Sequence, residues 1–95
     1  MENFTVQTKA MDSTVERRSV PILNKYERAA VLGKRAEQLS IEGITPLDKS
    51  LIVGKSADEI AMMELNRGLI NYSISRRMPD GSYEYWHLKD LKLNY

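Results

Sequence analysis

The sequence predicts an α+β fold in which two main helices pack with a small C-terminal antiparallel β-hairpin. Two stretches begin with a complete helix-capping signal and continue with apolar residues at spacings of three and four. After Gly68 the apolar spacing changes to two, and a Pro-Asp-Gly turn separates two short stretches of this kind. The chain has 95 residues, which is enough for one domain.

We expect residues 1–21 to form a flexible leader and residues 22–95 to form the folded domain. Phe4, Val6 and Met11 stand isolated among polar and charged residues, without a steady period. Terminal segments of this composition commonly lack a fixed structure.

The first helix is expected to start at Asn24, because Asn is a good N-cap and Glu27 can bond back to it. Gly43 is expected to end this helix. Its predicted buried stripe consists of Ala29, Leu32, Ala36 and Leu39.

Gly33 lies inside the first predicted helix, where it costs roughly 1 kcal/mol relative to Ala. Close approach of another backbone would offset this cost, and the residues around Gly33 are small enough to permit it. Arg28 and Arg35 are seven residues apart and therefore lie on the same side of the helix.

Residues 44–55 are predicted to be a loop, in which residues 51–53 form either a short strand or a packed loop segment. Residues 53–56 resemble the end of a phosphate-binding loop. The full motif requires glycine where Lys49 stands, and Ser56 is better explained as a helix cap.

The second helix is expected to begin after Ser56, which forms a capping box with Glu59. Gly68 is placed to end it at the C′ position. Its predicted buried stripe consists of Ala57, Ile60, Ala61 and Leu65, and Glu64 is assigned to a solvated face.

The hairpin is predicted from Ile70, Tyr72 and Ile74, which alternate with polar residues as in a half-buried strand. Residues 82–88 form the return strand after the turn. Residues 89–95 are expected to add a short strand or a helical turn.

Several kinds of chemistry are not supported. The chain has no cysteine for a disulfide or a cysteine zinc site, and its single histidine, His87, has no partners at a metal-ligand spacing. We therefore expect no catalytic residues, no metal and no cofactor. The 14 basic and 13 acidic side chains do not favour a dedicated nucleic-acid binder. No apolar run approaches a membrane span, so we expect a soluble, intracellular protein.

The hairpin carries residue types that are enriched at protein interfaces. Arg76 and Arg77 precede the turn, and Tyr83, Tyr85 and Trp86 follow it. These residues either form the hairpin core with solvated arginines or contact a partner. Trp86 faces away from the two tyrosines, so both faces of the strand are apolar and one of them favours a partner.

Three segments together resemble the omega-class small subunit of multisubunit RNA polymerases, a family that includes archaeal subunit K and bacterial omega. Residues 23–36 are similar to the first-helix signature of this family. Residues 58–61, with Glu64 and Leu65, are similar to its second helix, and residues 76–84 with Trp86 resemble the hairpin of its archaeal and eukaryotic branch.

The sequence also departs from this family. Asn71 stands where members often have proline, and the loop at residues 40–55 matches poorly. Eukaryotic relatives commonly carry a long acidic leader, whereas this leader is short and neutral. Roles of that acidic tract are therefore not transferred.

The resemblance implies a non-catalytic subunit that latches the largest polymerase subunit and aids assembly and stability. The implied partners are that subunit and the rest of the core, without direct specific nucleic-acid binding, in the nucleus or, for an archaeal or viral polymerase, the cytoplasm. Trp86→Ala and Arg77→Ala would then weaken partner binding more than they alter the fold. The expected partner-binding residues are Tyr26, Arg28, Gly33, Arg35, Arg76, Arg77, Pro79, Gly81, Tyr83, Tyr85 and Trp86.

Two other functions remain as alternatives. A DNA-binding helix-turn-helix would need a turn of about 3–4 residues, far shorter than the gap between the two predicted helices. A small enzyme would need a catalytic constellation, and none of the usual sets is complete in the sequence.

Overall fold

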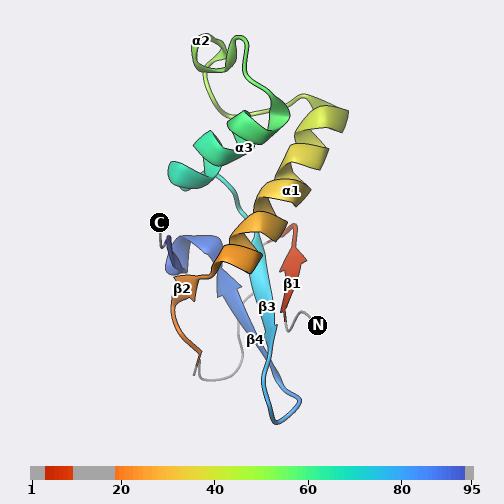
Figure 1. Cartoon of the computed structure of the whole chain (residues 1–95), viewed down its shortest axis with the longest axis vertical. Coiled ribbons are helices and arrows are strands. Elements are labelled where there is room, and N and C mark those ends of the chain that lie inside the picture. The colour runs from red at the N-terminus through yellow and green to blue at the C-terminus, as the bar shows by residue number, and fades with distance from the viewer. Residues whose placement is uncertain (1–3, 10–18, 94–95) are drawn as a thin grey trace.

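The computed structural model describes residues 4–9 and 19–93. Figure 1 shows the helices gathered at one end and the β3–β4 hairpin extending to the other. The predicted α+β fold, with two main helices and a C-terminal antiparallel hairpin, is confirmed. In chain order the elements are β1 (Phe4–Gln7), β2 (Ile22–Leu23), α1 (Lys25–Glu42), α2 (Lys49–Ile52), α3 (Ala57–Asn66), β3 (Ser73–Arg77), β4 (Tyr83–His87), a 3-10 turn η1 (Leu88–Asp90) and β5 (Lys92–Leu93).

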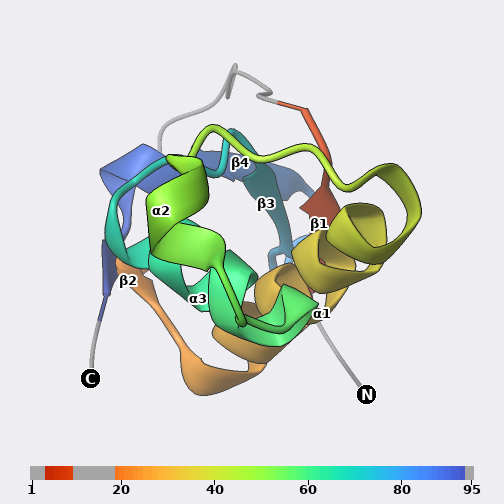
Figure 2. The ribbon, with the colours of Figure 1, turned by 90° about the horizontal axis from the view of Figure 1, so that it is seen from above.

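Two small sheets are formed. The first has the order β1-β3-β4 and is antiparallel throughout, and the second pairs β2 with β5 in parallel. Seen from above in Figure 2, α1 and α3 lie together on one side of the molecule, with β3 and β4 on the other.

The predicted start of α1 is confirmed. The Glu27 N–H donates to Asn24 Oδ1 at 2.8 Å, and the Asn24 N–H donates to Glu27 Oε1 at 3.2 Å. Gly43 ends the helix with a φ of 68°, a left-handed conformation that glycine adopts without strain.

The predicted buried stripe of α1 is partly wrong. Ala36 and Leu39 are buried and Leu32 is half-buried, but Ala29 is exposed. Val31 is fully buried instead and packs with the main core. The first half of α1 therefore packs on the main core through Val31, and its second half packs with Ala61 of α3 through Ala36 and Leu39.

The predicted start and end of α3 are also confirmed. Ser56 and Glu59 exchange hydrogen bonds at 3.2 Å, and Gly68 has a φ of 69° just after the helix. Ala61 and Leu65 are buried, and Ala57 and Ile60 are half-buried.

We expect Ser56→Ala to destabilise the protein by about 1 kcal/mol, because it removes the side-chain acceptor for the Glu59 N–H at the start of α3. Urea unfolding measures the effect. Ser40→Ala is the matched control, since Ser40 is exposed near the end of α1, and we expect it to change little. Equal stability of both variants would contradict the expected contribution of the Ser56 cap to stability.

The loop prediction for residues 44–55 is wrong at α2, and residues 51–53 form neither a strand nor a packed loop segment. Asp48 caps a single helical turn by accepting from the Ser50 N–H at 3.5 Å. Val53 follows this turn and is 78% exposed.

The prediction of a loose leader is wrong for Phe4–Gln7, which pairs with β3 as the edge strand β1. The alternation of Phe4 and Val6 with polar residues fits this pairing, and both side chains pack against the main core. The rest of the predicted leader includes residues 10–18, with Met11, which lie outside the described residues.

The β3 strand is buried on both faces, and not on one as predicted. Ile74 lies in the core, while Ser73 and Ser75 on the other face are 0% and 5% exposed. The Ser73 hydroxyl donates to the Lys9 carbonyl at 2.8 Å. The main core cluster contains Leu23, Val31, Leu65, Ile70, Tyr72, Ile74, Trp86, Leu88 and Leu91.

The turn of the hairpin is confirmed. The Gly81 N–H donates to the Met78 carbonyl at 2.9 Å, and Gly81 has a φ of 89°. After β4 the chain forms both predicted features, a helical turn (η1) and then the short strand β5 beside β2.

Candidate protein-partner interface

Arg76 joins three separate parts of the chain. Its guanidinium donates to both carboxylate oxygens of Glu27, in each case at 2.7 Å. Its other hydrogen bonds go to the carbonyls of Val20 and Ile22 at 2.6 and 2.8 Å and to the Ser19 hydroxyl at 3.1 Å. A guanidinium has five N–H donors, so every donor of Arg76 has a partner in the same chain.

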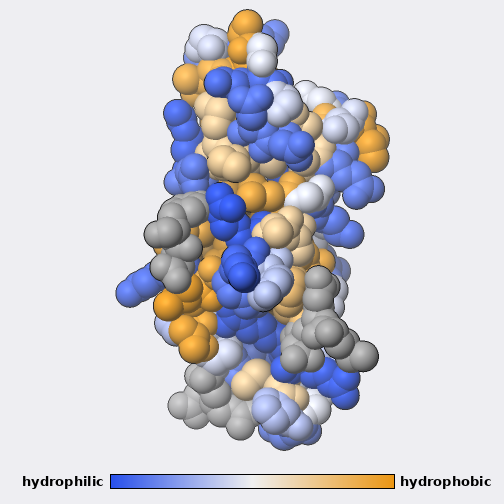
Figure 3. Space-filling view, viewed as in Figure 1, coloured by the Kyte–Doolittle hydropathy of each residue, from blue (hydrophilic) through white to orange (hydrophobic). Residues whose placement is uncertain are grey.

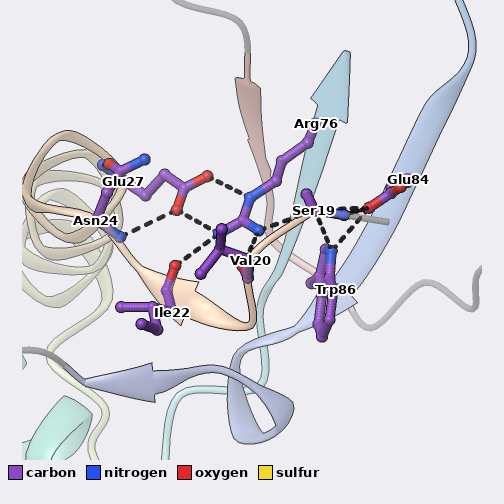
Figure 4. A network of polar contacts seen from close by, with 8 residues as sticks. All are labelled: Ser19, Val20, Ile22, Asn24, Glu27, Arg76, Glu84 and Trp86. Atoms are coloured by element: carbon purple, nitrogen blue, oxygen red, sulfur yellow. Dashed lines mark hydrogen bonds and ion pairs between the residues drawn. The ribbon is translucent and has the colours of Figure 1, made fainter. Parts of the chain in front are cut away.

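Figure 4 shows Arg76 reaching from β3 to the start of α1 and to the segment before β2. The side chains of the ion pair are 11% and 2% exposed for Arg76 and Glu27. In addition to its predicted capping role, Glu27 therefore fixes the hairpin to the helix through a buried, bidentate ion pair.

Ser19 and Glu84 extend this network to the return strand (Figure 4). The Ser19 hydroxyl donates to Glu84 Oε1 at 2.6 Å, and the Trp86 indole N–H donates to the Ser19 hydroxyl at 3.0 Å. Glu84 is fully buried, and the Arg76 guanidinium lies 5.7 Å from the centre of the Trp86 ring.

Arg35 forms a second buried ion pair, which joins α1 to α3. It donates to the two carboxylate oxygens of Glu64 at 2.5 and 3.0 Å, to Gln38 Oε1 at 3.0 Å and to the Ile44 carbonyl at 3.1 Å. The Thr45 hydroxyl also donates to Glu64, at 2.6 Å. Arg35 thereby ties both helices to the loop between them.

The electrostatics of this second pair fit its burial. The hydrogen bond to Glu64 raises the pKa of Arg35, which holds the guanidinium in its charged form. Burial raises the pKa of the nearby Tyr72 hydroxyl, which stays neutral and donates to Gln38.

The structure divides the predicted partner-binding residues into three groups. Arg35, Arg76 and Trp86 make their contacts inside the chain, and Trp86 is only 6% exposed. Arg28 and Tyr85 are half-buried. The exposed members are Tyr26, Gly33, Arg77, Pro79, Gly81 and Tyr83.

Among the described residues, the face of α1 around Gly33 is open. A Cβ atom added at Gly33 would meet none of their atoms within 4 Å, and Ala29 beside it is exposed. The expected close approach of another backbone is therefore not made by residues 4–9 or 19–93, and contact with a partner there stays a prediction.

Sequence reasoning missed the buried carboxylates. The assignment of Glu64 to a solvated face is wrong, since this residue is fully buried against Arg35. Ser19 was placed in the leader, and Glu84 was not singled out. The Arg35–Glu64 ion pair joins residues 29 positions apart and the Ser19–Glu84 hydrogen bond joins residues 65 positions apart, and no local spacing signals such contacts.

A groove of about 1210 Å³ lies where the start of α1, the segment before β2 and the end of β3 meet. Figure 3 shows hydrophobic surface over β2, with hydrophilic surface beside it. The lining residues are Phe4, Ser19, Val20, Ile22, Leu23, Asn24, Lys25, Tyr26, Glu27, Arg76, Arg77, Met78 and Pro79.

Other kinds of site find no support in the part of the chain that the structure describes. Residues 4–9 and 19–93 contain no group of three or more His, Cys, Asp or Glu side chains placed to hold a metal ion. Within the same residues, no helix is both long and apolar enough to cross a membrane.

Comparison with known proteins gives one consistent result. The family described as RNA polymerase Rpb6 matches residues 19–72, more than half of the chain. DNA-directed RNA polymerase subunit Rpo6 of Pyrobaculum aerophilum is 44% identical over 95 residues, which cover 96% of this chain and 88% of that protein.

Two eukaryotic relatives are longer. The probable subunit RPABC2 of DNA-directed RNA polymerases I, II, and III from Caenorhabditis briggsae is 40% identical over 97% of this chain and 66% of its own length. The Saccharomyces cerevisiae subunit RPABC2 is 38% identical over 92% of this chain and 54% of its own length. The chain thus spans about half to two thirds of the length of these eukaryotic relatives.

The matched region contains α1, the residues of both buried ion pairs except Arg76, and all of α3. The resemblance seen in the sequence is therefore confirmed, and the chain belongs to the RNA polymerase Rpb6 family.

Proposed function

We propose that this chain is a non-catalytic subunit of a DNA-directed RNA polymerase. In this role it latches the largest subunit and aids the assembly and stability of the complex. The observation that carries the proposal is the similarity to the Pyrobaculum aerophilum subunit, which covers 88% of that protein at 44% identity. The chain acts inside the cell, where the polymerase is.

The fold supports a binding role. Two buried ion pairs hold the hairpin, the helices and the segment before β2 in fixed positions. Large apolar side chains remain exposed on this fixed framework, among them Val20, Tyr26 and Tyr83. A rigid surface with exposed aromatic and cationic groups loses little conformational entropy when it binds another protein.

Affinity purification of the tagged chain from its native source at moderate salt tests membership of the polymerase. We expect mass spectrometry to find both large polymerase subunits in nearly equal amounts with the chain. Recovery of the chain alone, or with unrelated proteins only, would refute the proposal. Steeply salt-dependent binding to naked duplex DNA would then favour the DNA-binding alternative.

Reconstitution of the polymerase with and without the chain tests the latching role. We expect the largest subunit to be cleaved faster by limited proteolysis when the chain is missing, because a bound partner lowers the population of open states. Identical proteolysis in both preparations would show that the chain is bound but does not latch.

A further inference from the structure

The groove beside β2 has features that the fold itself does not need. Val20 and Tyr26 line it and are 62% and 64% exposed. Figure 3 shows the hydrophobic surface over β2, which is adjacent to the segment containing Val20. Exposed apolar side chains gathered at one groove commonly mark a binding site.

The size of the groove indicates the kind of ligand. Its volume of about 1210 Å³ exceeds the range of roughly 300–1,000 Å³ that is usual for small-molecule sites. A polypeptide segment fits such an open groove better than a metabolite does.

The charge of the groove indicates the composition of that segment. Its lining includes three cations and one carboxylate, and Arg76 neutralises the carboxylate of Glu27. Lys25 and Arg77 remain as positive charges, and neither forms an ion pair with another described residue. Acidic residues on the ligand would compensate both charges.

The groove is also held in shape before any ligand binds. Arg76 bonds to the carbonyls of Val20 and Ile22, which form one wall, and to Glu27 at the start of α1, which forms another. A preformed groove binds an extended segment at a lower entropic cost than a groove that must first be ordered.

We propose that this groove binds a segment of another polymerase chain that carries apolar anchors next to acidic residues. The apolar anchors pack between Val20 and Tyr26, and the acidic residues pair with Lys25 and Arg77. The proposal rests on the proposed function, because it takes the occupant from the polymerase.

Site-specific crosslinking tests the occupant. A photoreactive amino acid replaces Val20 in the full chain, and the polymerase containing it is purified and irradiated. We expect crosslinks to a single acidic and apolar segment of another polymerase chain. The control position is Val53, which is 78% exposed beyond α2 and outside the groove, and it should not crosslink to that segment.

The outcomes separate this proposal from the proposed function. The chain could remain in the polymerase while Val20 crosslinks only to nucleic acid, only to a basic segment, or to nothing. Any of these results would overturn the groove assignment and leave the proposed function intact. Failure of the unsubstituted chain to enter any polymerase would overturn the proposed function, and with it the source of the occupant.

Charge reversal provides a second measurement. A synthetic peptide with the sequence of the crosslinked segment should bind the Arg77→Glu chain about tenfold more weakly, since an attraction becomes a repulsion. Lys89→Glu reverses an exposed charge outside the groove and should leave the affinity unchanged. Equal effects of the two substitutions would show that only the net charge of the chain matters. That result would contradict binding of the segment in the groove.

Discussion

Arg76→Ala is expected to destabilise the isolated protein by about 3–5 kcal/mol, the cost of breaking a buried ion pair from one side. The substitution leaves the Glu27 carboxylate, whose side chain is 2% exposed, without its cation. It also removes the donors to the Val20 and Ile22 carbonyls. Since small domains are stable by only about 5–15 kcal/mol in total, a loss of this size is readily measured by urea unfolding.

Neighbouring variants provide the controls for this experiment. Arg77→Ala removes the same chemical group from the exposed next residue and should change stability by less than about 0.5 kcal/mol. Arg76→Lys keeps the charge but cannot supply five donors in a planar fork, so we expect an intermediate loss. If Arg76→Ala were as stable as Arg77→Ala, the ion pair with Glu27 would not stabilise the fold.

Trp86→Ala is expected to destabilise the protein by about 3–5 kcal/mol as well, because it leaves a large cavity in the main core. Trp86 is 6% exposed, and its indole N–H donates to Ser19 and Glu84. Unfolding must be followed by far-UV circular dichroism, since Trp86 is the only tryptophan in the chain.

This expectation replaces the one drawn from the sequence, in which Trp86→Ala mainly weakened partner binding. Tyr83→Ala is the matched control on the same strand, because Tyr83 is 49% exposed on the opposite face. We expect it to cost less than about 1 kcal/mol. A stable, folded Trp86→Ala protein that had only lost partner binding would restore the original interpretation.

The local elements were predictable because their signals lie within a few residues. Asn24 and Ser56 cap the helices that they were expected to cap, and the bonds that define each cap span three residues. The turn that ends at Gly81 needs a positive φ, which glycine supplies. The family resemblance was readable for the same reason, since it rests on short contiguous motifs.

The exposure of the predicted interface residues was harder to predict than the helix caps and the turn, because the exposure of a side chain depends on the whole fold. From the sequence, Arg76 and Arg77 were equivalent neighbours and both were assigned to a partner. In the structure Arg76 faces Glu27 and Arg77 faces solvent, since adjacent residues on a strand point to opposite sides. Similarly, Trp86 faces the core while Tyr83 stays exposed.

The α+β class, the starts and ends of the two main helices, the hairpin turn and the family could all be predicted from the order of the residues. The pairing of Phe4–Gln7 with the sheet, the burial of Glu27 and Glu64, and the ion pairs of these carboxylates with Arg76 and Arg35 became visible only in the folded chain. A cap or a turn is stabilised by bonds among neighbouring residues and can therefore be read locally. A buried ion pair is stable only when distant segments supply both charges together and exclude water from them, and this arrangement exists only once the chain has folded.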